Sequence, residues 1–457
     1  MLVEGTKYVT KEAILERAHE AIGIPFKNID TTGRLNTGKG AIGTVIEESW
    51  FGYTPNSESE PDFPEAGVEL KVTPYVRGKN GIRAKERLVC SIINYMEEYD
   101  KTFYDSAFWH KCNTMLLMSY EHVAGRPKGE FWIDKAILFC FPEEDLAIIE
   151  QDWKTIMDKV RSGRAHEISE GDTLYLAACT KGANSSSVRQ QPYSATPAKQ
   201  RAYSLKSSYM TQILNKYVFG NAENPHIIKS TEILQTQTFE EYIIKKIRPF
   251  YGMTQRQLMQ HFAVKSTAKS LNEILLACML GVSGRISHTD EFKKAGMIPK
   301  TVRVQRDGSV KESMSFPTFD FIALSKEQSW ETSELYNYLS PTKFMFVIFQ
   351  ENAQSEYVLE RIMFWNIPDR DLEHVRRVWE RTVQTIRKGV VLIPTLNGVH
   401  NNLPKQSEDP VAHVRPHGIK ASDKLPLPDG RMMTKQSFWL NNSYIAKQIK
   451  ENGYDVY

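Results

Sequence analysis

Hydrophobic and polar residues recur along the chain with two periods, one typical of helices and one typical of strands. Apolar residues return every three or four positions in 9–22 and in 41–50, where Gly52 supplies a stop, so both segments are predicted helices. Strands are predicted at 67–75, 88–93, 115–118 and 136–141. Further helices are predicted at 150–160 and 210–218, on either side of a loop-rich, basic stretch at 173–206. Helices around a mixed sheet indicate an α/β fold.

The length of the chain predicts two domains. Its 457 residues exceed the size at which one hydrophobic core keeps growing, and two domains of about 200 residues each are the natural division. Residues 221–237 contain a proline and have no clear period, so they are the candidate linker. We therefore expect a first domain at 1–220 and a second at 238–457.

The second half of the chain repeats the order of segments in the first. A predicted helix that ends at Gly281, the segment EFKKAGMIPKTVRV from Glu291 and the tripeptide KES at 311–313 follow one another there. In the first half, KGAIGTVIEESWFG, DFPEAGVELKVTPY from Asp62 and KER at 85–87 stand in the same order. This self-similarity predicts two duplicated domains.

Aligning the halves on their shared A-G-x-x-x-x-K core shows what the second half has lost. The aligned pairs are Asp62 with Glu291, Glu69 with Ile298, Leu70 with Pro299, Lys71 with Lys300, and Glu47 with Ala277. An isoleucine and an alanine have thus replaced two carboxylates. We expect the second domain to be catalytically degenerate and unable to hold a metal ion.

The composition is that of a folded protein and identifies no ligand by itself. With 41% hydrophobic and 25% charged residues the chain can form ordinary cores, and a net charge of +3 is too small to identify a nucleic-acid binder. The sequence contains no apolar run long enough to span a membrane and no signal-peptide core at its start, so a cytoplasmic location is expected. Five scattered cysteines without zinc spacing are expected to be reduced structural thiols.

Two carboxylates and a lysine are predicted to converge in the first half. Strand alternation puts Glu69 and Lys71 on one face, and the preceding turn brings Asp62 to the same edge. Mg²⁺ favours one or two carboxylates with water and phosphate oxygens, so Asp62 and Glu69, with the carbonyl of Leu70, are candidate ligands. The spacing alone is weak, because another Glu-x-Lys triplet starts at Glu291 and a solvated strand face would look the same.

The helix from Lys39 to Glu47, read with PDFPEAGVELK at 61–71, resembles the MutH mismatch-repair nicking endonucleases. Over the whole chain the sequence is more similar to the GATC-cutting restriction enzymes of the Sau-three-A type, through KERLVCSIINY, TKGANSSSVRQQPYS, AKQRAYSLKSSYMTQIL, HVRP and MTKQSFWLNNSYI. The resemblance implies two duplicated MutH-like domains of the PD-(D/E)xK nuclease fold, each a mixed central sheet flanked by helices. It also implies hydrolysis of DNA with Mg²⁺ and recognition of GATC.

The same resemblance implies which residues act in catalysis. They are Asp62, Glu69, Lys71, Glu47 and Lys111. The helix carboxylate has two candidates, because this sequence has an extra residue before Trp50. Counting forward from Gly43 selects Glu47, whereas counting back from Trp50 selects Glu48. We favour Glu47, because the helix enters from that side.

Basic and amide side chains in 175–201 are predicted to contact DNA, since they combine phosphate anchors with base-edge donors; a solvated loop is the alternative. The resemblance places the base-reading loop here. Its arginine and proline are Cys179 and Thr180 in this chain and are kept as Arg415 and Pro416 in the second half. The candidate DNA-binding residues are Lys39, Lys181, Asn184, Ser204, Lys206, Arg415 and Lys435.

The leading hypothesis is a type II restriction endonuclease of the IIE kind, which hydrolyses double-stranded DNA at GATC and binds a second site through its C-terminal domain as an allosteric effector. Ser204 stands where MutH carries a tyrosine that senses adenine methylation, so insensitivity to that methylation is implied. The alternatives are a strand-nicking repair endonuclease and a DNA-binding protein without cleavage activity. Expected partners are GATC-containing DNA, a second copy in a dimer on DNA, and a cognate DNA methyltransferase in the same host.

Overall fold

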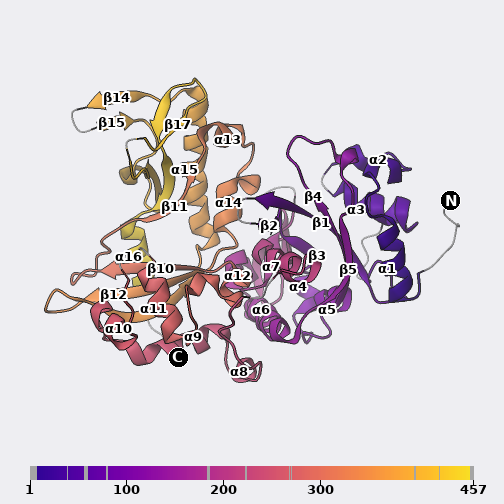
Figure 1. Cartoon of the computed structure of the whole chain (residues 1–457), viewed down its shortest axis with the longest axis horizontal. Coiled ribbons are helices and arrows are strands. Elements are labelled where there is room, and N and C mark those ends of the chain that lie inside the picture. Colours follow the sequence, from indigo (N-terminus) through magenta and orange to yellow (C-terminus); the bar gives the residue numbers. More distant parts are fainter. Residues whose placement is uncertain are drawn as a thin grey trace. The chain divides into compact units, whose positions relative to one another are not determined.

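The computed structural model describes residues 8–38, 40–55, 60–78, 81–182, 186–221, 224–266, 268, 270–395, 398–420 and 422–452. The chain divides into two compact units (Figure 1). Unit 1 comprises Met1–Phe239 with Ser287–Met297, and unit 2 comprises Glu240–Ile286 with Ile298–Tyr457. Both units combine helices with sheets, so the mixed α/β content expected from the patterning is confirmed.

Unit 1 begins with short helices, which are α1 (Lys11–Glu20), α2 (Phe26–Ile29), η1 (Arg34–Asn36) and α3 (Ala41–Val45). Thr10 caps α1 by accepting a hydrogen bond from the N–H of Ala13, and Ile14 and Ala18 form its buried stripe. The helix α3 continues directly into one π-helical turn, η2 (Ile46–Trp50). Such a turn accommodates one extra residue without breaking the helix.

The main sheet of unit 1 has the strand order β2-β1-β4-β5. Its strands are β1 (Glu69–Gly78), β2 (Gly81–Ala84), β4 (Thr114–Glu121) and β5 (Lys135–Cys140). The pair β1 and β4 is parallel, and the other two pairs are antiparallel. Since β4 is central and covered on both faces, its sequence is a nearly continuous apolar run. The helices α4 (Tyr95–Glu98), α5 (Ala107–Cys112) and α6 (Glu143–Arg161) belong to the same unit.

The basic stretch 173–206 was expected to be rich in loops, but it contains four strands. These are β6 (Leu176–Thr180), β7 (Val188–Gln191), β8 (Ser194–Lys199) and β9 (Arg201–Leu205). The antiparallel sheet β3-β9-β6 pairs two of them with β3 (Leu88–Ile92), and β7 and β8 form a hairpin. Small residues in β6 and a distant partner for β9 hide these strands from a local pattern, because tertiary pairing stabilises them.

Residues 221–237, the expected linker, lie within unit 1 together with α7 (Ser207–Ile213), η6 (Leu214–Val218) and α8 (Ile233–Thr236). Gln151 on α6 donates to the carbonyl of Leu234 at 2.8 Å. The helix α12 (Asp290–Ala295) also belongs to unit 1 and lies beside α7 (Figure 1). Its Lys294 ammonium is 2.6 Å from the Asp145 carboxylate, and both side chains are buried. The division of the chain is therefore set by tertiary packing at Phe239 and around 287–297 rather than by a break at 221–237.

Unit 2 contains a sheet of order β10-β12-β13 and a second sheet of order β11-β19-β16. Their strands are β10 (Ile298–Val304), β11 (Met314–Phe319), β12 (Phe344–Glu351), β13 (Tyr357–Trp365), β16 (Ala412–Pro416) and β19 (Gln436–Leu440). The pair β10 and β12 is parallel and the pair β12 and β13 is antiparallel, which matches β1, β4 and β5 in the main sheet of unit 1. Two hairpins are formed by β14 (Leu392–Thr395) with β15 (Gly398–Asn401) and by β17 (Lys424–Pro426) with β18 (Met432–Thr434).

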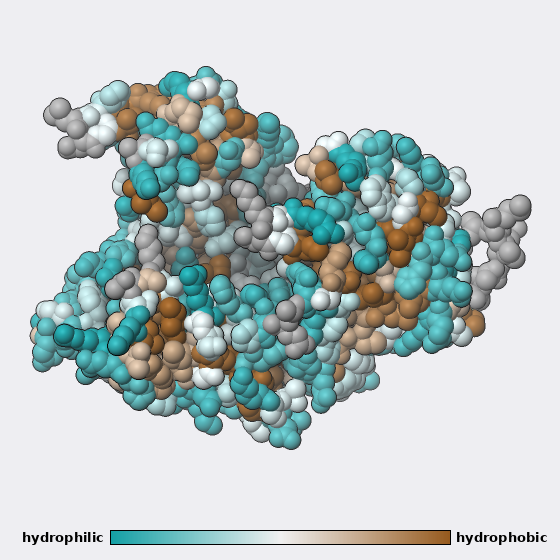
Figure 2. Space-filling model, in the orientation of Figure 1, coloured by the Kyte–Doolittle hydropathy of each residue, from teal (hydrophilic) through white to brown (hydrophobic). Residues whose placement is uncertain are grey.

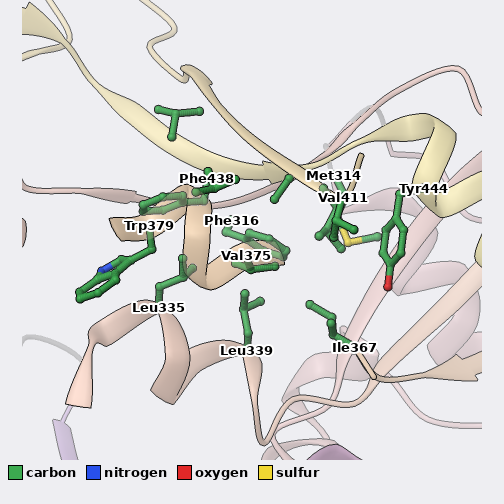
Figure 3. Close-up of a cluster of buried hydrophobic side chains, with 14 of the residues drawn as sticks. Met314, Phe316, Leu335, Leu339, Ile367, Val375, Trp379, Val411, Phe438 and Tyr444 are labelled. Carbon is green, nitrogen blue, oxygen red and sulfur yellow. The ribbon is translucent and has the colours of Figure 1, made fainter. Parts of the chain in front are cut away.

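Helices surround these sheets of unit 2. They are α9 (Phe239–Ile247), α10 (Gln255–His261), α11 (Leu271–Met279), α13 (Phe321–Lys326), α14 (Glu334–Leu339), α15 (Asp369–Lys388) and α16 (Asn442–Glu451). Figure 3 shows a core that joins side chains from several of these elements, among them Leu339, Val375 and Phe438. Because Phe438 is buried in this core, the face of β19 that carries it packs against the core.

Among the described helices, none is both long and apolar enough to cross a bilayer. Hydrophilic residues cover most of the face drawn in Figure 2, and the hydrophobic ones form separate patches.

Candidate active site

A tight turn before β1 brings two carboxylates together. The N–H of Phe63 donates to the carbonyl of Val68 and the N–H of Val68 donates back, so the chain reverses between them. The Asp62 carboxylate then accepts from the N–H of Leu70 at 3.0 Å, and the Glu69 carboxylate accepts from the N–H of Asp62 at 3.1 Å. These reciprocal bonds hold both carboxylates beside the Leu70 backbone.

Two lysines approach Glu69 from different elements. The Lys71 ammonium donates to Glu69 Oε1 at 2.7 Å and to the carbonyl of Cys90 at 3.4 Å. Lys111, in the last turn of α5, places its ammonium 3.7 Å from the same oxygen. Glu69 is 2% exposed, whereas the two lysine side chains are 15% and 13% exposed. The lysines therefore stand between the buried carboxylate and solvent.

The π-helical turn η2 separates the two candidate glutamates. Glu48 pairs with Arg34, whose Nε lies 2.5 Å from its carboxylate, and it accepts from Thr32 at the protein surface. Glu47 is half-buried and lies in the electrostatic field of Asp62 and Glu69. Glu47 is thus the glutamate of the π turn that lies close to the two carboxylates.

The electrostatics of the site favour an additional cation. Burial, reinforced by the charges of Asp62 and Glu69, raises the pKa of Glu47 to about 7. Burial also raises the pKa of Glu69 to about 7, although Lys71 opposes the shift. Burial alone would lower the pKa of Lys71, but the Glu69 charge overrides it and holds that pKa above its usual range. Three carboxylates share one site, and the two lysines do not fully offset them.

The donor set fits a divalent metal ion. Among the described residues, no three His, Cys, Asp or Glu side chains converge closely enough to enclose a metal by themselves. Mg²⁺ needs only one or two carboxylates, because it keeps several waters and takes phosphate oxygens from a substrate. Asp62, Glu69 and the carbonyl of Leu70 could supply such a partial set.

The expected DNA-binding residues are not gathered in one place. Lys39 and Asn184 lie outside the described residues, Lys181 is exposed next to β6, and Lys435 is half-buried 3.8 Å from Asp423. The side chains of Ser204 and Lys206 are buried, the latter donating to the carbonyl of Thr173. The structure therefore corrects the expectation that these two side chains are open to DNA, because both lie inside unit 1. Arg415, on β16, is exposed.

Sequence reasoning missed several groups that support the site. The carbonyl of Cys90 receives Lys71, and the buried Cys112 follows Lys111 directly. Neither cysteine stands in a motif, so no local signal could have singled them out. His110, which could be mistaken for a general base, instead pairs at the surface with Glu60 at 2.8 Å.

Comparison with known proteins agrees with this geometry. A family model for the DNA mismatch repair enzyme MutH matches residues 51–152. The DNA mismatch repair protein MutH of Shewanella baltica (strain OS195) is 31% identical over 218 residues, covering 45% of this chain and 95% of that protein. The type II restriction enzyme Sau3AI of Staphylococcus aureus is 38% identical over 486 residues, covering 97% of this chain and 99% of that protein. The chain belongs to the Sau3AI family of type II restriction enzymes.

Membership in the Sau3AI family makes the chain a type II site-specific deoxyribonuclease with a MutH-like nuclease domain. Restriction and MutH-type nucleases in general depend on a divalent metal ion. The match to the MutH model includes Asp62, Glu69, Lys71 and Lys111, and Glu47 precedes it by a few residues.

The two neighbouring glutamates allow a matched test. Glu47→Gln should lower the rate of DNA cleavage by about two orders of magnitude, because it removes a charge that faces the reacting centre. Glu48→Gln should change the rate only a few-fold, since Glu48 makes a surface pair with Arg34. Initial rates on a supercoiled plasmid at fixed Mg²⁺ measure both effects. Loss of cleavage in Glu48→Gln with retention in Glu47→Gln would reverse the assignment.

Proposed function

We propose that this type II restriction endonuclease cuts double-stranded DNA at GATC with Mg²⁺, using one active centre per chain in unit 1. The observation that carries the proposal is the convergence of Glu47, Asp62, Glu69, Lys71 and Lys111. A silent DNA-binding protein would gain nothing from such a set, since buried like charges cost stability. The GATC specificity rests on the similarity to the Sau3AI family.

The bound Mg²⁺ would supply a nucleophilic water of lowered pKa and positive charge beside the scissile phosphate. Asp62, Glu69 and the carbonyl of Leu70 would hold it. The Lys71 ammonium, 2.7 Å from Glu69, would orient the attacking water and offset charge in the transition state. Lys111 would add a second positive charge from α5. Hydrolysis then proceeds by direct attack of water, without a covalent intermediate.

The proposal includes partners as well as chemistry. The substrate is double-stranded DNA that contains GATC, and a dimer on DNA would allow both strands to be cut together. A cognate DNA methyltransferase in the same host would protect that host's own sites. The exposed Lys181 and the β7–β8 hairpin with Arg189 are the elements of unit 1 that we assign to DNA contact.

Removing single members of the site tests the central proposal. Asp62→Asn, Glu69→Gln and Lys71→Ala should each abolish cleavage of a GATC plasmid in Mg²⁺, while binding of a GATC duplex changes only a few-fold, because most phosphate and base contacts lie elsewhere. Ile298→Ala, which alters the aligned position in unit 2, should retain cleavage. Chelation by EDTA should stop the wild-type reaction. Persistent cutting by any of the three site variants would refute the assignment.

We also propose that adenine methylation does not block cleavage. The Ser204 side chain is buried, and its hydroxyl donates to the carbonyl of Ala177 at 3.4 Å. This burial supports the proposal, because a short buried side chain at this position would not contact an N6-methyl group of DNA.

Plasmids that differ only in methylation test this point. Unmethylated and fully N6-adenine-methylated GATC plasmids should be cut with initial rates within a few-fold of each other, because no side chain at Ser204 reaches the methyl group. A plasmid without GATC is the negative control. A rate lower by orders of magnitude on the methylated plasmid would contradict the proposal.

Unit 2 is proposed to be a degenerate copy of the nuclease domain. The similar strand orders of the two units support this reading. Ile298 begins β10 as Glu69 begins β1, and the Lys300 ammonium donates to the carbonyl of Ser315 as Lys71 does to that of Cys90. Burial lowers the pKa of Lys300, because no carboxylate like Glu69 accompanies it and Glu273 offsets the effect only partly.

The residue aligned with Asp62 also supports degeneracy. Glu291 lies on α12 in unit 1, where its carboxylate accepts from the N–H groups of Ile227 and Ile228 at 2.9 to 3.1 Å. We propose that unit 2, having lost this chemistry, binds a second GATC site and stimulates unit 1. A MutH-like repair nickase is the weaker alternative, since the MutH relative matches 45% of this chain and 95% of its own length, which leaves no room for a second unit.

Plasmids with one and two GATC sites test the effector role. The two-site plasmid should be cut faster, and a short GATC duplex added in trans should accelerate cleavage of the one-site plasmid, because the second site binds unit 2. Arg415→Ala should require a higher duplex concentration by roughly ten-fold or more, as expected for one bidentate base contact. Equal rates on both plasmids, with Arg415→Ala like wild type, would make unit 2 purely structural.

A further inference from the structure

The paired strands β16 and β19 in unit 2 carry an aromatic and cationic cluster on one face. His413 and Arg415 are two residues apart on β16 and share a face, and Trp439 on β19 stands directly opposite His413. The neighbouring Phe438 points into the core of unit 2 (Figure 3), so strand alternation turns Trp439 away from that core. We call His413, Arg415, His417 and Trp439 the Trp439 cluster.

Arg415 is held in the Trp439 cluster by a ring rather than by an anion. Its guanidinium carbon lies 4.7 Å from the centroid of the Trp439 ring. The rings of His413 and His417 lie 6.4 and 5.2 Å from the same ring, and Ser437 hydrogen-bonds His417 at 2.9 Å. Among the described residues, the Arg415 guanidinium has no hydrogen-bond or ion-pair partner, and Arg415 is exposed. The planar guanidinium is therefore oriented by the ring, while its N–H groups donate to none of the described residues.

The Trp439 cluster contains buried polar atoms that lack hydrogen bonds, and packing alone does not explain them. Trp439 Nε1 and His413 Nε2 are buried without a hydrogen-bond partner among the described residues. Buried polar atoms are satisfied in most native structures, so each exception calls for an explanation. An exposed arginine stacked on a tryptophan with unsatisfied polar atoms beneath is thus more consistent with a binding face than with a structural one.

The equivalent ladder in unit 1, β6 with β9, carries small residues on the matching face. The two ladders can be matched at their first pairs, Leu176 with Leu205 and Ala412 with Leu440. The next pair is Ala177 with Ser204 in unit 1 and His413 with Trp439 in unit 2. Two residues further on β6, Cys179 takes the place of Arg415. The aromatic and cationic face is therefore particular to unit 2 and is not required to form this sheet.

We propose that Trp439 is a positioning residue of the second DNA site, whose ring fixes the plane of the Arg415 guanidinium so that Arg415 reads a guanine edge. This inference rests on the proposed effector role of unit 2. Bidentate recognition of guanine O6 and N7 requires a fixed plane, and stacking on an aromatic face supplies it. A phosphate can accept the guanidinium fork from several directions, whereas a guanine edge accepts it only in the plane of the base, so a fixed plane favours a base over the backbone.

The test measures how two short duplexes stimulate cleavage of a one-site plasmid. One duplex contains GATC, and the other is identical except that 7-deazaguanine replaces the guanine of GATC. For the wild type, the half-maximal concentration should be about ten-fold or more higher for the 7-deazaguanine duplex, because one hydrogen bond to N7 is lost. Trp439→Leu should respond to the GATC duplex as weakly as the wild type responds to 7-deazaguanine, with little discrimination between them. Trp439→Phe, which keeps a ring, should restore most of the difference.

Controls separate folding from recognition. Trp132→Ala removes another exposed tryptophan with an arginine over it, Arg126 at 5.3 Å in unit 1, and should leave duplex stimulation unchanged. The thermal unfolding midpoints of Trp439→Leu and Trp439→Phe should match that of the wild type. A defect shared equally by both variants would indicate lost packing and would overturn the positioning role.

The remaining outcomes distinguish this inference from the effector proposal. If Trp439→Leu discriminates between the duplexes as the wild type does, the positioning role is wrong while the effector role stands. If Arg415→Ala weakens the response to both duplexes by the same factor and leaves the discrimination intact, Arg415 contacts phosphate and the base-reading assignment is wrong. If no duplex stimulates the wild type, the effector proposal fails and this inference fails with it.

Discussion

The active site depends on the reciprocal hydrogen bonds between Asp62 and the start of β1. Each carboxylate accepts from a backbone N–H next to the other, so neither can move without breaking a buried bond. This arrangement holds Glu69 almost fully out of solvent, where an unpaired charge would be costly. Lys71, from the same strand, and Lys111, from α5, offset that charge. The parallel pairing of β1 with β4 brings α5 close enough to do so.

The same constraint explains the π turn and the electrostatics around it. A regular α-helix with an extra residue would rotate either Glu47 or Trp50 out of place, whereas one wide turn lets both stay. Trp50 is fixed by stacking with Arg17 and by donating to its carbonyl at 2.9 Å. Glu47 consequently remains near Asp62 and Glu69, where burial and like charge raise its pKa. The protein thus holds negative charge in excess until a divalent cation or a proton offsets it.

Local patterns were sufficient where a segment's own residues determine its structure. The apolar run of β4 and the alternation of β1 predict the main sheet, and family resemblance supplied the proposed catalytic set. Local patterns were insufficient where the structure of a segment depends on residues far away in the sequence. The strands β6 and β9 pair across the β7–β8 hairpin, and Ser204 is buried within that pairing. Lys206 is buried next to it, where its ammonium donates to the carbonyl of Thr173. The contact of Glu48 with Arg34 and the nearness of Glu47 to Asp62 and Glu69 separate the two glutamates, and no pattern in the sequence encodes either.

On the proposed duplication, the two units have diverged in complementary directions. Unit 1 keeps the carboxylates at and just before the start of its first strand and has small residues on one face of the β6–β9 ladder. Unit 2 has an isoleucine at the corresponding strand position and an arginine stacked on a tryptophan on its ladder. The counterpart of Asp62 cannot be recovered by a single substitution in unit 2, because Glu291 is a helical residue whose carboxylate binds backbone N–H groups of unit 1. Restoring Ile298 to glutamate would therefore bury a charge beside Lys300 without creating a second ligand, and unit 2 would remain unable to cleave.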